Sequence, residues 1–447
     1  MTTPTIPYYP MTHDDGLDII EALSDIKDAI YSASARSGTV YGFHINANES
    51  DPEDAVTYIE DAVGLTPAYM DYSNNRFVYG SWENAFFMPK PCMLKYNGTV
   101  DYYLDPDDYT KQIDGVTASD VANASYGGNA MMEWGQNGKK IWYKIVPDGA
   151  GSSVDVYIAD YRVDDDYHAW SFINSANEMV DHFYTPIYNG SIDSSGRLRS
   201  ISGIARSESW AAVSGHLCEF GTAQQERDAA RLNGSNIWDT EVYADTILIN
   251  LLLTLMSKSL DVQTAFGQGC TSPGQSGVLT SGTGNTLGMF YGYSDTTHVV
   301  KVFGMENWWG NLWRRFGGLV NDNGTMKYKL TRGVADGSKA TDYAISATSS
   351  DYANYLVGNS LPAASGSYVS QYWFNKYGAA VPKAVIGTAA TFYCDALWTN
   401  NGQVDYASRG GSSTGGSGCG AWCLSLSIAV SNASWNVGAA PSCKPLS

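Results

Sequence analysis

The N-terminal region combines a Pro/Thr-rich start with one amphipathic stretch. Within residues 17–35, four apolar side chains are spaced by four, three and four positions, which places them on one stripe of a helix: Ile19, Leu23, Ile26 and Ile30. The same spacing fits a short coiled-coil seam. Residues 1–38 are therefore predicted to be an extended segment and a helix, which either packs on its own domain or serves docking and oligomerisation.

Short apolar runs separated by turn residues replace the helical pattern in residues 39–125. Four runs have the composition of strands: 40–45, 77–82, 92–96 and 100–104. Asn97-Gly98, between the last two runs, is a strong signal for a hairpin turn. This region is predicted to be a small β-rich domain.

Residues 126–447 mix strand and helix patterns, and no long linker divides them. The expected elements are, in order, a hairpin, a strand, a short helix and two longer helices: 131–145, 154–163, 171–183, 207–232 and 237–259. Short strands and long Gly/Ser/Thr-rich loops follow residue 266. Helices among many short strands predict an α+β fold, with one large domain over 126–447.

The most apolar run, 246–256, does not qualify as a membrane span. It has about half of the ~20 residues that a span needs and contains Asn250, so a buried core helix is expected. The N-terminus has no basic stretch followed by an apolar core, which argues against a secretory signal.

The charge of the chain restricts its partners. Its formal net charge is −19, so its surface would repel both nucleic acids and anionic membranes, and neither is expected to bind. Only 16% of the residues are charged, and polarity comes from Ser, Thr, Asn, Gly and 31 Tyr. This composition is typical of antibody-like binding surfaces, and it is equally compatible with an ordinary Tyr-rich β-protein.

The seven cysteines form no regular framework. An odd number in a long chain favours reduced thiols in a protein made in a cytoplasm. Cys419 and Cys423 lack the second pair or the histidines that a zinc site needs, so no metal or cofactor is expected.

Two motifs carry most of the information. The first, 304–318, holds Trp308, Trp309 and Trp313 around the turn Gly310-Asn311 and predicts a rigid buried aromatic turn, with a sugar-binding platform as the alternative. The second begins at Arg409-Gly410-Gly411-Ser412 and continues into an alternating strand, 421–430. In that strand Trp422, Leu424, Leu426 and Ile428 share one face, and Cys423, Ser425, Ser427 and Ala429 share the other.

In their order, these elements resemble the formylglycine-generating-enzyme type of C-type-lectin fold. The matching features are an early strand in the segment 157–174, a Gly-Asn-x-Trp motif at Gly310, Asn311 and Trp313, the Arg-Gly-Gly-Ser motif at 409–412, and a closing strand at 437–440. The resemblance covers roughly residues 126–447 and implies a C-terminal C-type-lectin-like domain.

The whole chain also resembles structural proteins of bacteriophages and prophages, some of which end in a lectin fold that a diversity-generating retroelement varies. The resemblance implies a virion protein, assembled in the bacterial host cytoplasm, that binds a bacterial surface protein or glycan, contacts other virion proteins and forms a homo-oligomer, which we expect to be a trimer. The implied variable, ligand-binding residues are Trp398, Asn400, Asn401, Tyr406, Ser413, Thr414, Ser417, Trp422, Ser425, Ser427, Ser431, Asn432, Ser434, Trp435 and Asn436.

Two alternatives stay open. The chain could be a structural head or tail decoration without a specific ligand. It could also be a copper-dependent oxidase, since the related enzymes use a cysteine pair near the Arg-Gly-Gly-Ser motif; Cys419 and Cys423 lie there but are separated by three residues where the enzymes have four. No hydrolase or calcium-lectin motif is present, so no catalytic residue is assigned and a binding protein is expected.

Overall fold

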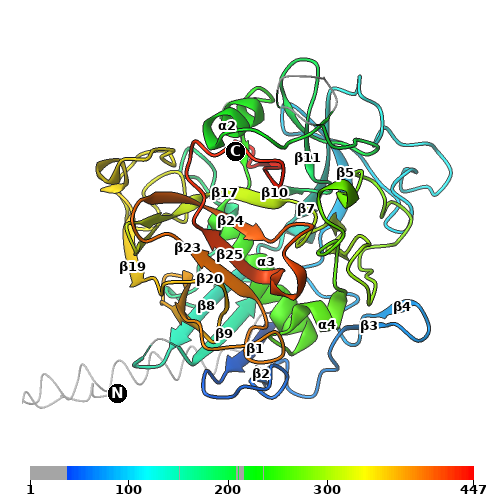
Figure 1. Cartoon of the computed structure of the whole chain (residues 1–447). Helices are drawn as coiled ribbons and strands as arrows, with labels where there is room; N and C mark the ends of the chain where they lie inside the picture. The colour runs from blue at the N-terminus through cyan, green and yellow to red at the C-terminus, as the bar shows by residue number, and fades with distance from the viewer. Residues whose placement is uncertain (1–37, 151, 208–209, 211–215, 235, 447) are drawn as a thin grey trace, which may run out of the picture. The chain divides into compact units, whose positions relative to one another are not determined.

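The computed structural model describes residues 38–446 apart from 151, 208–209, 211–215 and 235. The helix expected over 17–35 lies outside the described residues. From Val40 onward the chain forms one compact unit, mostly β, with three α-helices in its described part (Figure 1). This composition is compatible with the α+β class.

A four-stranded antiparallel sheet joins the first strands of the unit to strands from beyond residue 140. Its order is β2 (Val56–Glu60), β1 (Val40–Ile45), β9 (Val154–Ala159), β8 (Trp142–Pro147). The strand expected over 40–45 is confirmed, and Phe43 and Ile45 face the core. The strand expected over 154–163 ends at Ala159.

A six-stranded antiparallel sheet contains both early and late strands. Its order is β14 (Trp238–Thr240), β27 (Pro441–Cys443), β10 (Phe183–Pro186), β7 (Gly128–Trp134), β5 (Lys90–Lys95), β6 (Val100–Tyr103). The hairpin expected at Asn97-Gly98 joins β5 to β6, and Gly98 has the positive φ of 81° that such turns favour. Because β5 pairs directly with β7, the expected boundary at residue 125 lies inside one sheet.

The largest sheet, of eight strands, is built from the C-terminal half of the chain. Its order is β19 (Leu356–Ser360), β18 (Thr325–Tyr328), β17 (Trp313–Asp322), β24 (Val404–Gly410), β25 (Gly420–Leu426), β23 (Ala396–Thr399), β20 (Ser365–Tyr368), and β26 (Val437–Gly438) pairs with the start of β17. The strand expected over 421–430 is shorter than predicted because β25 ends at Leu426.

Helix α3 (Tyr243–Ser257) forms the centre of the core. All 15 of its residues are buried, as its apolar sequence on every side requires. Asn250 is satisfied by two partners: its Nδ2 donates to the Ala421 carbonyl at 2.7 Å, and its Oδ1 accepts from Trp308 Nε1 at 2.9 Å. The helix therefore packs against the large sheet, beside β17, β24 and β25 in Figure 1. Within the described residues, no helix has the length and apolar character needed to cross a membrane.

The other two helices are short. Helix α2 (Ala223–Arg231) starts with a capping box between Thr222 and Gln225, and α4 (Val262–Phe266) is capped by Asp261. The helix expected over 207–232 is thus much shorter in the described part of that segment. The segment 237–259 begins with strand β14 before α3 starts.

Two further expectations are wrong. Residues 131–145 do not form a hairpin: Gly135, with φ of 99°, turns the chain so that β7 and β8 enter different sheets. Residues 171–183 are not a helix but a short 3₁₀ turn, Trp170–Phe172, followed by a loop into β10. The Asn174 side chain holds this loop by accepting from the backbone N–H groups of Ala176 and Glu178.

Small sheets and bridges complete the described unit. They comprise β12 (Leu198–Ser200) with β11 (Gly190–Ile192) and β13 (His216–Leu217), β15 (Lys301–Val302) with β16 (Met305–Glu306), β21 (Gln371–Phe374) with β22 (Ala380–Ala384), and β3 (Tyr69–Asp71) with β4 (Arg76–Val78). The strand expected over 77–82 therefore ends early, at Val78.

Candidate functional site

An open pocket of about 330 Å³ lies on the outer face of the large sheet, which we call the C-terminal pocket. Strands β17, β23 and β25 contribute side chains to it, together with the loops 412–415 and 427–436. Its position follows from strand alternation: residues of β25 that face α3 are apolar, and those that face away carry small polar groups.

The floor of the pocket belongs to a row of side chains across neighbouring strands, of which Trp398 and Ser425 line the pocket itself. Ser425 of β25 is paired with Trp398 of β23 on one side and with Ser408 of β24 on the other. Directly paired residues project from the same face of a sheet. Trp398, Ser425 and Ser408 therefore share the outer face, and Ser408 is in turn paired with Arg315 of β17.

Two indole rings form the apolar wall. Trp313 and Trp398 meet edge to face, with centroids 5.3 Å apart and planes at 84°. Cys423 and Val437 are buried against Trp313, and Ile428 packs on this cluster from the rim. This packing fixes the wall before any ligand arrives.

The polar lining consists of hydroxyl and amide groups that contact one another. Ser425 and Ser427 hydroxyls are 3.2 Å apart, and Ser434 Oγ donates to Asn436 Oδ1 at 2.8 Å. Every lining residue is uncharged. The lining therefore offers hydrogen-bonding groups but no carboxylate, imidazole or amine that could act in general acid–base catalysis.

The backbone of the loop 427–436 is anchored from below by a buried ion pair. Arg315 and Glu226 of α2 are 2.6 Å apart and 1% exposed each. Arg315 also donates to the Asn432 carbonyl at 2.5 Å, and the Phe220 N–H donates to the Ser434 carbonyl at 3.0 Å. The loop is thus held through its main chain, and these two bonds use none of its side chains.

The pocket gathers seven of the fifteen residues expected to bind a ligand. They are Trp398, Thr414, Ser425, Ser427, Asn432, Ser434 and Asn436. Four others are exposed but lie outside the pocket: Asn400, Asn401, Ser417 and Ser431. Trp435 is half-buried and also lies outside it.

Three of the expected residues are buried outside the pocket and are removed from the candidate binding face. Trp422 is 2% exposed because it lies on the α3 side of β25, where its Nε1–H donates to Thr254 Oγ1 at 3.2 Å. Tyr406 packs into a separate apolar cluster at 2% exposure. Ser413 is fully buried, and its backbone N–H donates to the Asn311 carbonyl at 3.1 Å.

The sequence reasoning missed several pocket residues. Trp313 was expected in a structural turn, with a sugar-binding platform as the alternative, and was not among the fifteen expected binding residues, yet it lines the pocket. Val437 lines it because β26 runs parallel to β17, a pairing that no local pattern reveals. Ser412 carried a usable signal, since it lines the pocket and belongs to the Arg-Gly-Gly-Ser motif.

The two sequence motifs are in contact. Arg409 donates to the Trp308 carbonyl at 2.7 Å and to Glu241 at 2.5 Å, and its guanidinium stacks over the Trp308 ring at 3.2 Å. The Gly310 N–H donates to the Gly410 carbonyl at 2.9 Å. All three tryptophans of the turn are at most 7% exposed, so the expected buried aromatic turn is confirmed.

Cys419 and Cys423 are both fully buried thiols. Burial raises the pKa of each thiol well above its ordinary value, which disfavours the thiolate that copper binding uses. Cys419 Sγ contacts the Ser412 carbonyl at 3.5 Å and fills the space beside Gly411 and Gly415, so it has a packing role in the glycine-rich loop.

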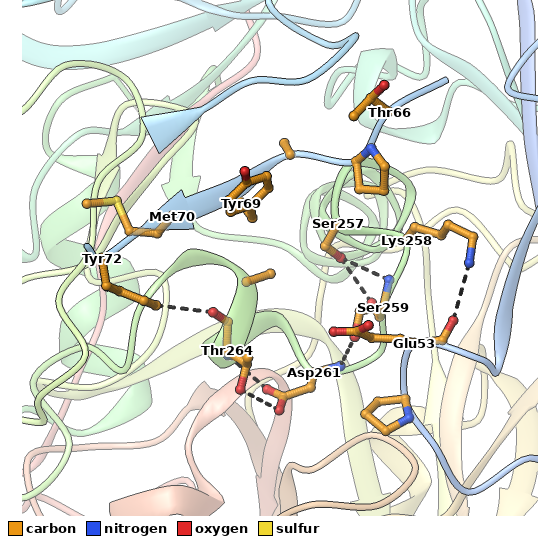
Figure 2. A pocket seen from close by; sticks show the side chains of 14 residues that line it. Glu53, Thr66, Tyr69, Met70, Tyr72, Ser257, Lys258, Ser259, Asp261 and Thr264 are labelled. Carbon is orange, nitrogen blue, oxygen red and sulfur yellow. Dashed lines mark hydrogen bonds between the residues drawn. The ribbon is translucent and has the colours of Figure 1, made fainter. Parts of the chain in front are cut away.

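A larger cavity, of about 550 Å³, lies at the C-terminal end of α3 (Figure 2). Its polar groups already serve the fold: Asp261 caps α4 by accepting from Thr264, Tyr72 donates to the Thr264 carbonyl, and Lys258 donates to the Glu53 carbonyl. None of the fifteen expected residues lines it. We therefore regard the C-terminal pocket as the candidate site, and the chain matches no protein-family model and no curated protein.

Proposed function

We propose that this chain is an adhesion protein of a bacteriophage virion and that it binds a ligand on the host surface through the C-terminal pocket. The observation that carries the proposal is the convergence of seven expected binding residues, from three separate segments of sequence, on one open pocket. Small ligands bind in such concave sites with an apolar wall and a few converging polar groups.

The construction of the site suits a surface whose side chains change. Its walls rest on a buried sheet, and the loop 427–436 is held by main-chain bonds to Arg315 and Phe220. A substitution at Asn432 or Ser434 would change the chemistry of the pocket without removing those bonds. A formylglycine-type lectin scaffold varied by a retroelement would need this arrangement, in which the backbone stays fixed while the exposed side chains change.

Repetition of the site would strengthen adhesion. A single small pocket gives modest affinity, and a homotrimer that presents three pockets to one cell would gain avidity from its effective concentration. We therefore include a trimer in the proposal, to be measured by light scattering of the purified full chain.

Binding to intact cells tests the proposed function. Fluorescently labelled full chain would be mixed with candidate host bacteria and bound protein counted by flow cytometry. We expect saturable binding to a subset of strains, and at least about a tenfold loss for the double variant Ser434→Ala/Asn436→Ala. Ser431→Ala, in the same loop but outside the pocket, is the matched control and should bind as the original chain does.

Two results would contradict the proposal. A decoration protein without a ligand would bind no strain at all. Binding that survives the double variant but falls with the control would place the ligand elsewhere on the surface.

A further inference from the structure

The charge of the C-terminal pocket contrasts with that of the whole chain. The protein carries a formal charge of −19, yet no acidic or basic side chain lines the pocket. The guanidinium of Arg315, which bonds the Asn432 carbonyl, is 1% exposed and is neutralised by Glu226 at 2.6 Å. A charged ligand group would lose its hydration here without gaining a counter-ion, at a cost in binding free energy.

The lining of the pocket has hydrogen-bonding groups that a ligand can reach. Thr414 and Asn432 are exposed and Ser427 is half-buried, and each brings a hydroxyl or amide group to the lining. Ser425 also lines the pocket, at 3% exposure, with its hydroxyl 3.2 Å from that of Ser427. A purely apolar ligand would displace water from these polar groups without replacing its hydrogen bonds, so the preferred ligand brings hydroxyl or amide groups of its own.

The wall of the pocket adds a flat apolar surface to this polar lining. Trp398 is half-buried and stands next to Ser425, held edge to face against Trp313. An indole offers a flat apolar face, which packs well on the C–H face of a sugar ring while the hydroxyls of the ring reach the polar floor. The pocket volume of about 330 Å³ is at the small end of the ~300–1,000 Å³ usual for small-ligand sites.

We infer that the C-terminal pocket recognises a neutral carbohydrate, namely an uncharged terminal sugar of a cell-surface glycan. This inference rests on the proposed adhesion function and specifies its ligand. The uncharged lining disfavours sialic acids, uronic acids and the charged side chains of a protein epitope. The openness of the site lets the rest of the glycan remain in solvent.

Chemical treatment of the cells separates the two possible ligand classes. Mild periodate oxidises sugar diols, and protease removes surface proteins. We expect periodate to abolish binding and protease to leave it. Sensitivity to protease alone would keep the adhesion function and overturn the carbohydrate assignment, and no binding to any untreated cell would overturn the adhesion function itself. If both treatments reduce binding, glycans released from the cells are added as competitors. Inhibition of cell binding by these glycans supports the carbohydrate assignment, and no inhibition overturns it.

A panel of immobilised oligosaccharides tests the charge preference directly. The full chain should bind neutral members and ignore their sialylated or uronic-acid counterparts. Ser427→Asp should lower affinity for the neutral members by about tenfold or more, because it places a carboxylate in the uncharged pocket. Ser431→Asp, which adds the same charge outside the pocket, is the control and should bind normally. Preference for charged members, or equal loss in both variants, would overturn the inference.

Discussion

Trp422→Ala directly tests which way strand β25 faces. Trp422 is 2% exposed, and its indole packs on the rings of Tyr372 and Tyr393 with centroid separations of 5.0 and 5.7 Å. Removing a buried tryptophan lowers the free energy of unfolding by about 3–5 kcal/mol. The Thr254 hydroxyl also loses the indole donor 3.2 Å away, which adds about 1 kcal/mol. We therefore expect a total loss of about 4–6 kcal/mol.

Urea unfolding followed by circular dichroism measures this loss, and Trp398→Ala is the matched comparison. Trp398 lies on the opposite face and is only half-buried, so its removal should cost about 1–2 kcal/mol while it abolishes ligand binding. The reverse result would refute the reasoning. A stable Trp422→Ala chain that no longer binds, beside a Trp398→Ala chain that barely folds, would mean that the strand register is shifted by one residue.

Three further predictions concern the surroundings of the pocket. Gly411→Ala should lower the melting temperature and the ligand affinity, because Gly411 has φ of 81° and an added Cβ would lie 2.2 Å from Cys419 Sγ; Cys419→Ala in the same chain should restore part of both. Burial raises the pKa of Asp405 to about 6, so its contribution to stability is full below the unfolded pKa and is lost as the pH rises through 6. Asp405→Asn, which mimics the protonated acid, should therefore gain about 1–3 kcal/mol in urea unfolding at about pH 7.5 and nothing at about pH 4, and an equal gain at both would contradict this. Finally, the seven buried thiols should resist a thiol-reactive dye in the native state and all react in denaturant; rapid labelling of Cys419 or Cys423 in the native chain would reopen the oxidase alternative.

Local patterns in the sequence were enough to predict some elements of the fold. The strand over 40–45 and the hairpin at Asn97-Gly98 are confirmed, because each depends on alternation or on one turn. The core helix within 237–259 is confirmed because no amphipathic surface helix would be apolar on every side. The strand alternation at Ser425 and Ser427 also assigned the outer face correctly.

The elements that the sequence did not predict depend on pairing between strands that are far apart along the chain. Strand β8 pairs with β9, which follows it directly, whereas β7 pairs with β5 and β10, which are distant from it in sequence. The loop after residue 172 carries apolar residues at helical spacing, but side-chain bonds from Asn174 stabilise a turn instead. The burial of Trp422 follows from its own alternation pattern; it was included in the binding face because its residue type is common in binding sites.

The order of strands in the six-stranded sheet constrains how this protein is made. Strand β27, residues 441–443, is inserted between β10 and β14, in a sheet whose other members precede residue 241. While the ribosome is still synthesising the segment that forms the C-terminal pocket, β10 and β14 lack the strand that pairs with both of them. They stay unpaired on that edge until β27 is made. The sheet can therefore close only after synthesis has passed the pocket region, and a chain stopped at any point within 398–436 would leave it with unpaired strand edges open to aggregation.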